Sequence, residues 1–282
     1  MTTDRRDMHF VSTDWLADHL GAPDIVVVDG TWFLPPLGRD GWLEYLERHI
    51  PGAVFFDIDE IADTSSSLPH MLPRPEKFAS RMRALGIGDG QKIVVYDALG
   101  LFSAARVWWT FKVMGARDVV VLDGGLPAWI AAGHPVEAGE VERSPRHFTA
   151  RLDSASVRDF SEVLANLDSK AAQVVDIRPA DRYSGASPEP RPGLKSGHIP
   201  GSLNVPFTSL VADGHLRPAE ELAEVFANAG VDLRRPVITS CGSGVTAALA
   251  LLALDVAGAR SVTLYDGSWA EWGSRDDAPL EK

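Results

Sequence analysis

The feature that most limits how this chain can fold is an internal repeat. Short motifs of the first half return in the same order in the second half, most of them 143 residues further on. The two His-Ile-Pro-Gly motifs lie 149 residues apart, so the repeat contains a few net insertions or deletions. Ordered matches of this kind indicate two homologous halves within the 282 residues. The matches are Gly115-Ala116-Arg117 with Gly258-Ala259-Arg260, Asp123-Gly124 with Asp266-Gly267, Trp129 with Trp272, Pro75 with Pro218, and His49-Ile50-Pro51-Gly52 with His198-Ile199-Pro200-Gly201.

Each half alternates short apolar runs with helical patterns, which is typical of an α/β fold. The runs are continuously apolar, as expected for parallel strands that are buried on both faces. We therefore predict two tandem domains, each a mainly parallel sheet covered by helices on both faces. We expect the first domain at 1–138, a polar linker without periodicity at 139–154, and the second domain at 155–282. The predicted strands are 25–28, 93–96 and 119–122 in the first half, and 174–176, 237–240 and 262–265 in the second.

Composition and charge exclude several functions. The formal net charge is −12, which disfavours a general nucleic-acid or anionic-membrane surface. The amino-terminal residues are polar, and no apolar run approaches the ~20 residues that span a bilayer, so we expect a soluble, cytoplasmic protein. A single cysteine allows neither an internal disulfide nor a cysteine-based zinc cluster. The eight histidines have no short metal-ligand spacing, so we expect neither a metal nor another cofactor.

The single cysteine, Cys241, follows the predicted strand 237–240 and precedes a helix that is expected to begin near Thr246. Open α/β sheets bind ligands at this position. Gly242 and Gly244 allow the backbone to curl, so that successive N–H groups can point at one anion. Charge-assisted hydrogen bonds of about 1.5–3 kcal/mol each would then be enough to hold the cysteine as a reactive thiolate. A buried inert cysteine, the alternative, would not need such a loop.

The first half provides an internal comparison for this loop. An ungapped alignment places Ala98 opposite Cys241, and an alignment with a gap places Asp97 there. Either way the first half has no nucleophilic sulfur, so we expect it to be catalytically silent. A cysteine phosphatase would need an arginine six residues after the cysteine, where this chain has Ala247, so phosphatase chemistry is disfavoured.

With these motifs the sequence resembles the two-domain rhodanese-like sulfurtransferases over nearly its full length. The resemblance is carried by His-Ile-Pro-Gly and Asp-Gly-x-x-x-x-Trp in both halves and by Cys-Gly-Ser-Gly-Val-Thr at 241–246. That loop is similar to the loop of the 3-mercaptopyruvate sulfurtransferase subgroup. The resemblance implies that Cys241 takes sulfur from 3-mercaptopyruvate, releases pyruvate, and passes the sulfur from a persulfide to an acceptor. The acceptor would be a small thiol, a thioredoxin-like protein or cyanide.

The resemblance also implies roles for further residues. Arg182 and Arg191 match the two arginines that bind the substrate carboxylate, for which a planar guanidinium is well suited. Asp59, His70 and Ser243 match a proton relay, in which His70 would protonate the departing enolate. Asp59 could instead cap a helix beginning near Glu60. We expect Gly242, Gly244, Val245 and Thr246 to line the substrate site together with the two arginines.

Two alternatives remain open. A thiosulfate sulfurtransferase would keep Cys241 and change only the donor pocket, although such relatives usually carry basic residues after the cysteine. A persulfide carrier with little turnover would need only Cys241, and the arginine pair argues against it.

Overall fold

The computed structural model describes residues 5–282, which form two compact units. Unit 1 contains the described residues up to Thr64, together with Leu72–Asp153 and Asp213–Leu216. Unit 2 contains Ser65–Met71, Ser154–Ala212 and Arg217–Lys282. Each unit therefore includes one short segment from the other half of the sequence. The domains expected from sequence, 1–138 and 155–282, are continuous and therefore assign each of these two segments to the half of the sequence in which it occurs.

Unit 1 is built on a five-stranded sheet in the order β1-β5-β4-β2-β3, and every neighbouring pair is parallel. β2 and β4 run side by side from the pair Ile25 and Lys92 to the pair Asp29 and Tyr96, so both strands end at one edge of the sheet. The strands are β1 (Phe10–Val11), β2 (Ile25–Asp29), β3 (Val54–Phe55), β4 (Lys92–Tyr96) and β5 (Val119–Leu122).

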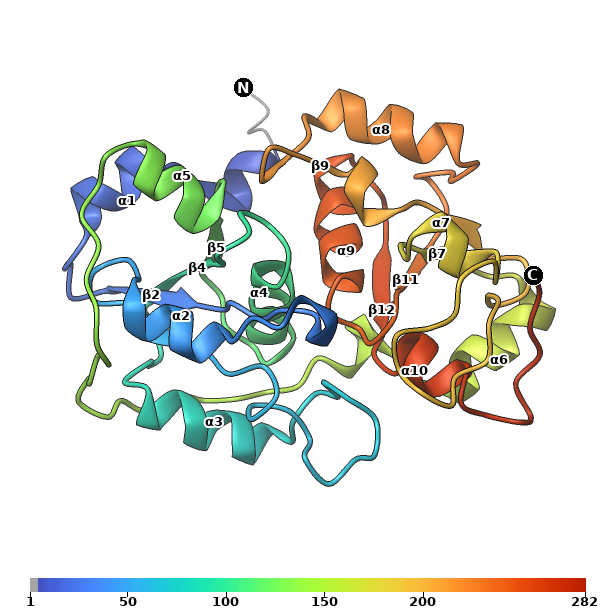
Figure 1. The fold of residues 1–282 in the computed structure, drawn as a ribbon, viewed down its shortest axis with the longest axis horizontal. Helices are drawn as coiled ribbons and strands as arrows, with labels where there is room; N and C mark the ends of the chain where they lie inside the picture. Colours follow the sequence, from blue (N-terminus) through green and yellow to red (C-terminus); the bar gives the residue numbers. More distant parts are fainter. Residues whose placement is uncertain (1–4) are drawn as a thin grey trace. The chain divides into compact units, whose positions relative to one another are not determined.

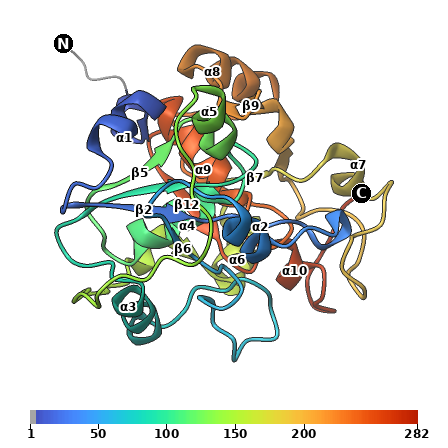
Figure 2. The same cartoon turned by 60° about the vertical axis from the view of Figure 1, so that its left-hand side comes forward.

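Helices pack on both faces of this sheet (Figures 1 and 2). On one face, Leu16 of α1 and Trp129 of α5 pack against alternate strand residues such as Val27 and Val94. On the other face, Phe78 of α3 and Phe111 of α4 contact each other at a ring distance of 5.4 Å. The helices are α1 (Thr13–His19), α2 (Gly41–Glu47), α3 (Pro75–Ala84), α4 (Ala104–Val113) and α5 (Gly125–Ala131), with single turns η1 (Arg6–Met8) and η2 (Pro35–Leu37).

Unit 2 repeats this topology with the strand order β6-β12-β11-β7-β8, again entirely parallel. Each strand takes the place of its counterpart in the first sheet, so the repeat in the sequence is a repeat in the fold. The strands of this sheet are β6 (Val157–Arg158), β7 (Gln173–Asp176), β8 (Leu203–Asn204), β11 (Val237–Ser240) and β12 (Val262–Tyr265). Two further short strands are β9 (Val211–Ala212) and β10 (His215–Leu216).

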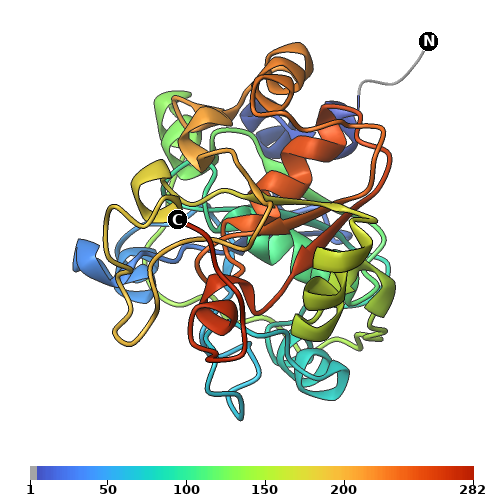
Figure 3. The same ribbon diagram turned by 90° about the vertical axis from the view of Figure 1, so that its right-hand side faces the viewer.

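The second sheet is also covered on both faces. α6 and α10 pack Phe160 and Trp272 against one face, at a ring distance of 5.1 Å. α8 and α9 lie on the other side, which Figure 3 shows in orange above the red and yellow-green helices α10 and α6. The elements are α6 (Phe160–Ser169), α7 (Ala180–Tyr183), α8 (Ala219–Asn228), α9 (Ala247–Val256) and α10 (Ser268–Trp272), with single turns η3 (Ser154–Ser156) and η4 (Phe207–Ser209).

The fold class predicted from the sequence is confirmed. All six predicted strands form, and each differs from its predicted bounds by at most one residue at an end. α3 begins at Pro75, because proline suits a first helical turn, and Gly86 follows the helix with φ 68°. A helix beginning near Glu60, the alternative role considered for Asp59, does not form. Instead, Asp57 accepts hydrogen bonds from the amides of Asp59 and Glu60 in a turn.

The segment expected as a linker is held along unit 1 in an extended conformation. Arg151 and Asp153 donate main-chain hydrogen bonds to the carbonyls of Met114 and Val113. Phe148 is buried against Phe78 at a ring distance of 5.5 Å. Residues up to Asp153 thus belong to unit 1.

The two His-Ile-Pro-Gly motifs have one structural role in both units. The ring of His49 stacks on Tyr45 at 4.2 Å, and the ring of His198 stacks on Tyr183 at 3.8 Å. The Nδ1 atom of each histidine is hydrogen bonded to the carbonyl of that same tyrosine, at 2.7 Å and 2.9 Å. These contacts fix the chain before β3 and β8 and leave both histidines buried.

Candidate active site

Cys241 lies directly after β11, at the carboxyl end of a central strand of the second sheet. Its side chain is buried. The Cys241 amide donates a hydrogen bond to Ser268 Oγ at 3.3 Å, and its carbonyl accepts one from the Trp269 amide at 2.9 Å. The Gly242 carbonyl accepts from the Ala270 amide at 2.8 Å. The first turn of α10 therefore fixes the main chain that carries the cysteine.

Glycine is required at positions 242 and 244 of the loop for two different structural reasons. Gly244 adopts φ 81°, the left-handed region in which other residues are strained. Gly242 does not need an unusual φ, but a Cβ atom there would lie 3.2 Å from Arg182 Nη2. Gly242 thus permits the close approach of an arginine to the cysteine loop. The loop ends at Thr246, which precedes α9, and Ser243 and Val245 are buried within it.

In unit 1 the position of Cys241 is occupied by Asp97. The Asp97 carbonyl accepts from Leu126 at 3.0 Å, as the Cys241 carbonyl accepts from Trp269. One residue earlier, Tyr96 accepts from Gly30 as Ser240 accepts from Ile177. The ungapped alignment, which places Ala98 opposite Cys241, is therefore wrong, and the gapped one is correct. The reason is that the loop from Asp97 to α4 is one residue longer than the loop from Cys241 to α9.

The loop of unit 1 holds a carboxylate on main-chain amides. Asp97 Oδ2 accepts hydrogen bonds from Phe102 at 2.7 Å and Ala104 at 2.8 Å, and Oδ1 accepts from Leu99 at 2.8 Å. Burial raises the pKa of Asp97, and these amide hydrogen bonds act in the opposite direction. The loop between β4 and α4 thus surrounds the Asp97 carboxylate with main-chain N–H groups.

His70 and Ser243 are brought together within unit 2. His70 belongs to the segment 65–71, which packs with this unit. Its Nδ1 atom lies 3.0 Å from Ser243 Oγ and 3.4 Å from the Ser243 carbonyl oxygen. His70 is buried and adopts φ 59°, which is uncommon for a residue with a side chain. The surrounding contacts therefore hold the ring at the cysteine loop in spite of a backbone cost.

Asp59 lies in unit 1, and its side chain is exposed. Its Oδ2 atom accepts a hydrogen bond from Trp32 Nε1 at 3.0 Å. The structure brings His70 and Ser243 into contact. The relay, with Asp59 as its third member, stays a prediction.

Arg182 extends from α7 toward Gly242 and is bound by an internal carboxylate. Its Nη2 atom forms an ion pair with Glu189, and its Nε atom donates to Glu189 Oε1 at 3.3 Å. The Glu189 side chain is only 2% exposed. Arg182 is thus held against the cysteine loop by a buried partner.

The sequence reasoning missed the residue that organises this cluster, Arg178. Its Nε and Nη2 atoms donate to Asp176 Oδ2 at 2.9 Å and 2.6 Å, and its Nη1 atom donates to Glu189 at 2.7 Å. The guanidinium also lies 4.2 Å above the ring of Trp269. Arg178 and Glu189 were missed because no motif of the repeat contains them. The available signal was the Asp-x-Arg spacing, in which Asp176 ends a predicted strand and Arg178 follows it.

The second expected substrate arginine, Arg191, lies two residues beyond Glu189 in the loop that follows α7. It is half-buried. Its role in binding stays a prediction.

Within residues 5–282, no group of three or more histidine, cysteine, aspartate or glutamate side chains is arranged to hold a metal ion. No helix in that range has the length and hydropathy needed to cross a membrane.

The fold agrees with the comparison to known families. Residues 12–132 and 159–275 each match the rhodanese-like domain. The chain belongs to this family and contains two copies of its domain.

Among individual relatives, the chain is 47% identical over 273 residues to the 3-mercaptopyruvate sulfurtransferase of Escherichia coli K12, covering 96% of this chain and 97% of the relative. The crystal structure of SseA, a 3-mercaptopyruvate sulfotransferase of E. coli, superimposes with a TM-score of 0.86 at 45% identity and covers 92% of this chain and 98% of that structure. The human 3-mercaptopyruvate sulfurtransferase is 44% identical, with coverage of 94% and 92%. A thiosulfate sulfurtransferase of Cricetulus griseus is 45% identical, with coverage of 93% and 91%.

The ion pairs of Arg178 predict a large loss of stability when this side chain is removed. Replacing Arg178 with methionine leaves Asp176 and Glu189 without their shared cation, which should cost about 3–5 kcal/mol of the free energy of unfolding. Urea denaturation of the full chain measures this difference. Arg234→Met is the matched control, because Arg234 pairs with Asp232 while its own side chain is 89% exposed. It should change stability little. Equal losses in both variants would contradict the structural role of Arg178.

Proposed function

We propose that this protein is a 3-mercaptopyruvate sulfurtransferase that carries sulfur on Cys241. The observation that carries the proposal is the position of Cys241, at the carboxyl end of β11 in a glycine-containing loop. The equivalent loop of unit 1 holds the Asp97 carboxylate on three amides. A thiolate in the place of that carboxylate would be stabilised in the same way. The relatives named above support the choice of substrate.

In the proposed reaction the Cys241 thiolate attacks the sulfur of 3-mercaptopyruvate. The new S–S bond forms as the carbon–sulfur bond breaks, and the bonding electrons leave with the enolate of pyruvate. Protonation of that enolate completes the half-reaction. Ser243 and His70, hydrogen bonded to each other at 3.0 Å, are the groups that we assign to this proton transfer. Asp59 is the proposed third member of the relay.

The substrate carboxylate binds Arg182 in this proposal, with Arg191 as a second cation. Arg182 lies against Gly242, so a carboxylate on its guanidinium is close to the main chain of the cysteine loop. Gly244, Val245 and Thr246 complete the wall of the site. Glu189 already occupies Arg182, and the substrate must therefore share this arginine or replace Glu189 as its partner.

The second half-reaction returns Cys241 to the thiolate. A small thiol, a thioredoxin-like protein or cyanide attacks the outer sulfur of the persulfide, and Cys241 is the leaving group. The full cycle needs Cys241 as a thiolate, because an oxidised Cys241 would not accept another sulfur. The proposed reaction is therefore suited to a reducing compartment such as the cytoplasm.

Repeated sulfur transfer on Cys241 is the first expected outcome. Incubation with 3-mercaptopyruvate should add the mass of one sulfur atom to the intact protein, and an added thiol should remove it over many cycles. Intact-protein mass spectrometry follows both steps. Cys241→Ser should give no adduct and no turnover, because the hydroxyl cannot form a persulfide. A single slow addition that a thiol does not reverse would instead indicate a persulfide carrier.

The donor preference separates the proposed function from a thiosulfate sulfurtransferase. We expect a much higher kcat/KM for 3-mercaptopyruvate than for thiosulfate, because Gly242 and Ser243 bring no positive charge to a dianion. Steady-state assays with both donors measure this ratio, and an equal or reversed ratio would contradict the assignment. A Gly242→Arg, Ser243→Lys double variant should gain thiosulfate turnover. The same variant should lose 3-mercaptopyruvate turnover, because any side chain at 242 presses on Arg182.

Arg182→Ala should raise KM for 3-mercaptopyruvate with a smaller effect on kcat. The loss of a charge-assisted hydrogen bond of about 1.5–3 kcal/mol corresponds to a decrease of roughly 10- to 150-fold in kcat/KM. Arg182→Lys should give an intermediate value, since it keeps the charge without the planar fork. Arg234→Ala serves as the exposed control. An unchanged KM in Arg182→Ala would remove this residue from the proposed substrate site.

A further inference from the structure

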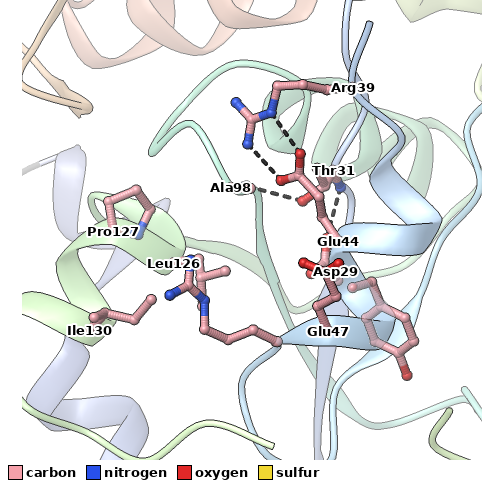
Figure 4. A pocket seen from close by; sticks show the side chains of 11 residues that line it. Asp29, Thr31, Arg39, Glu44, Glu47, Ala98, Leu126, Pro127 and Ile130 are labelled. Atoms are coloured by element: carbon pink, nitrogen blue, oxygen red, sulfur yellow. Dashed lines mark hydrogen bonds and ion pairs between the residues drawn. The ribbon is translucent and has the colours of Figure 1, made fainter. Parts of the chain in front are cut away.

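Unit 1 contains a cavity of about 670 Å³ next to the carboxyl ends of β2 and β4. Figure 4 shows Asp29 and Thr31 in its middle and the bidentate pair of Arg39 and Glu44 on one wall. Leu126 and Ile130 of α5 form an apolar wall. Asp97 fills the amide ring beside this cavity with its own carboxylate. The amides that could hold an anion at the position equivalent to Cys241 are therefore already used by Asp97.

Asp29 occupies the same position in unit 1 as Asp176 does in unit 2. Each ends the second strand of its half and accepts a side-chain hydrogen bond, at 2.9 Å, from the amide two residues later. The Asp29 carbonyl accepts from Phe56, and the Asp176 carbonyl accepts from Val205. The two carboxyl groups therefore have equivalent main-chain surroundings.

The two carboxyl groups differ in the cation that faces them. The residue two positions after Asp176 is Arg178, whose guanidinium binds Asp176 through two nitrogens. The residue two positions after Asp29 is Thr31, whose hydroxyl accepts a hydrogen bond from the Ala98 amide at 3.0 Å. Thr31 is shorter than arginine and uncharged. The repeat thus keeps the buried carboxyl group in unit 1, replaces its cation with a small side chain, and has a cavity beside it.

We propose that the cavity of unit 1 binds a small organic cation, with a guanidinium or ammonium group on Asp29 and a hydrocarbon chain against Leu126 and Ile130. The bound group would take the place that Arg178 has in the other half. Arg39 is neutralised by Glu44, and Arg48, which also lines the cavity, is exposed, so water screens its charge. Glu47 adds a further negative charge to the lining. This proposal does not depend on sulfur transfer.

The proposed binding depends on pH. Burial raises the pKa of Asp29 to about 6, and the hydrogen bonds from Thr31 and Tyr96 limit this rise. Below that value the carboxyl group is protonated and attracts a cation weakly. Affinity should therefore rise as pH increases through about 6 and level off above it. The other titratable or charged groups around Asp29 are Tyr96 and Asp97 from β4 and its loop, Arg39 before α2, and Glu44, Tyr45, Glu47 and Arg48 at α2, while α5 contributes only apolar residues.

Calorimetric titration of the full chain at pH 8 with butylguanidinium, and with the neutral isostere butylurea, tests the proposal. Butylguanidinium should bind at least tenfold more tightly than butylurea, and the preference should disappear at pH 5. Equal affinities for the two probes, or no butylguanidinium binding up to about 10 mM, would overturn the proposal.

Two variants locate the binding. Thr31→Arg supplies the guanidinium from the chain itself, as in unit 2, and should weaken butylguanidinium binding at least tenfold, whereas Thr31→Ser should keep it. Asp29→Asn should remove the preference over butylurea. Binding that is unchanged in both Thr31→Arg and Asp29→Asn would place the ligand elsewhere and overturn the proposal. The comparison of the two probes on the unaltered protein decides the matter even if a variant fails to fold.

Discussion

The structure depends on one arrangement of main-chain amides at the carboxyl end of a central parallel strand. In unit 1 this arrangement is occupied by the Asp97 carboxylate, which accepts three N–H groups. In unit 2 the same position on the strand carries Cys241. Every residue except proline carries the same main-chain N–H group, so what matters is its orientation, which depends on the strand, the loop conformation and the following helix. The parallel sheet and its flanking helices are thus needed to orient the amides around the side chain of Cys241.

The two units also differ in how they satisfy a buried carboxyl group on the neighbouring strand. Asp176 in unit 2 has Arg178, and Arg178 in turn holds Glu189, which holds Arg182. A buried ion pair is costly to desolvate and still more costly to break. The chain of contacts therefore fixes Arg182 beside Gly242 more firmly than an exposed arginine on a short helix could be fixed. Unit 1 has no arginine at the corresponding position, and its Asp29 lines a cavity instead.

Much of this fold could be predicted from the sequence, because buried parallel strands leave continuous apolar runs and the repeat gives each run a counterpart. The Cys241 loop was predictable for the same reason, since it joins one of these strands to a helix. The exchanged segment 65–71 could not be predicted, because no periodic pattern shows with which half a loop packs. The contact of His70 with Ser243 was reached only through a family resemblance. Arg178 and Glu189 were missed because a buried ion pair between loops has no sequence period. The sequence left both Ala98 and Asp97 as possible counterparts of Cys241. The loop after β4 is one residue longer than the loop after β11, and only the main-chain hydrogen bonds show which residues correspond.

The charges around Arg182 place a physical constraint on the proposed binding of a substrate carboxylate to this residue. Arg178 and Arg182 are balanced by Asp176 and Glu189, so this buried cluster has no net positive charge. The chain as a whole is strongly acidic, and long-range attraction cannot supply what the cluster lacks. A carboxylate therefore gains from Arg182 only through direct, well-oriented hydrogen bonds that compete with those of Glu189. A site of this kind would bind a planar carboxylate that is held at one distance from the cysteine. It would bind only weakly an anion that is attracted by charge alone. The proposed role of a second arginine, Arg191, follows the same reasoning, because another guanidinium at the site would add positive charge to a cluster that has none in excess.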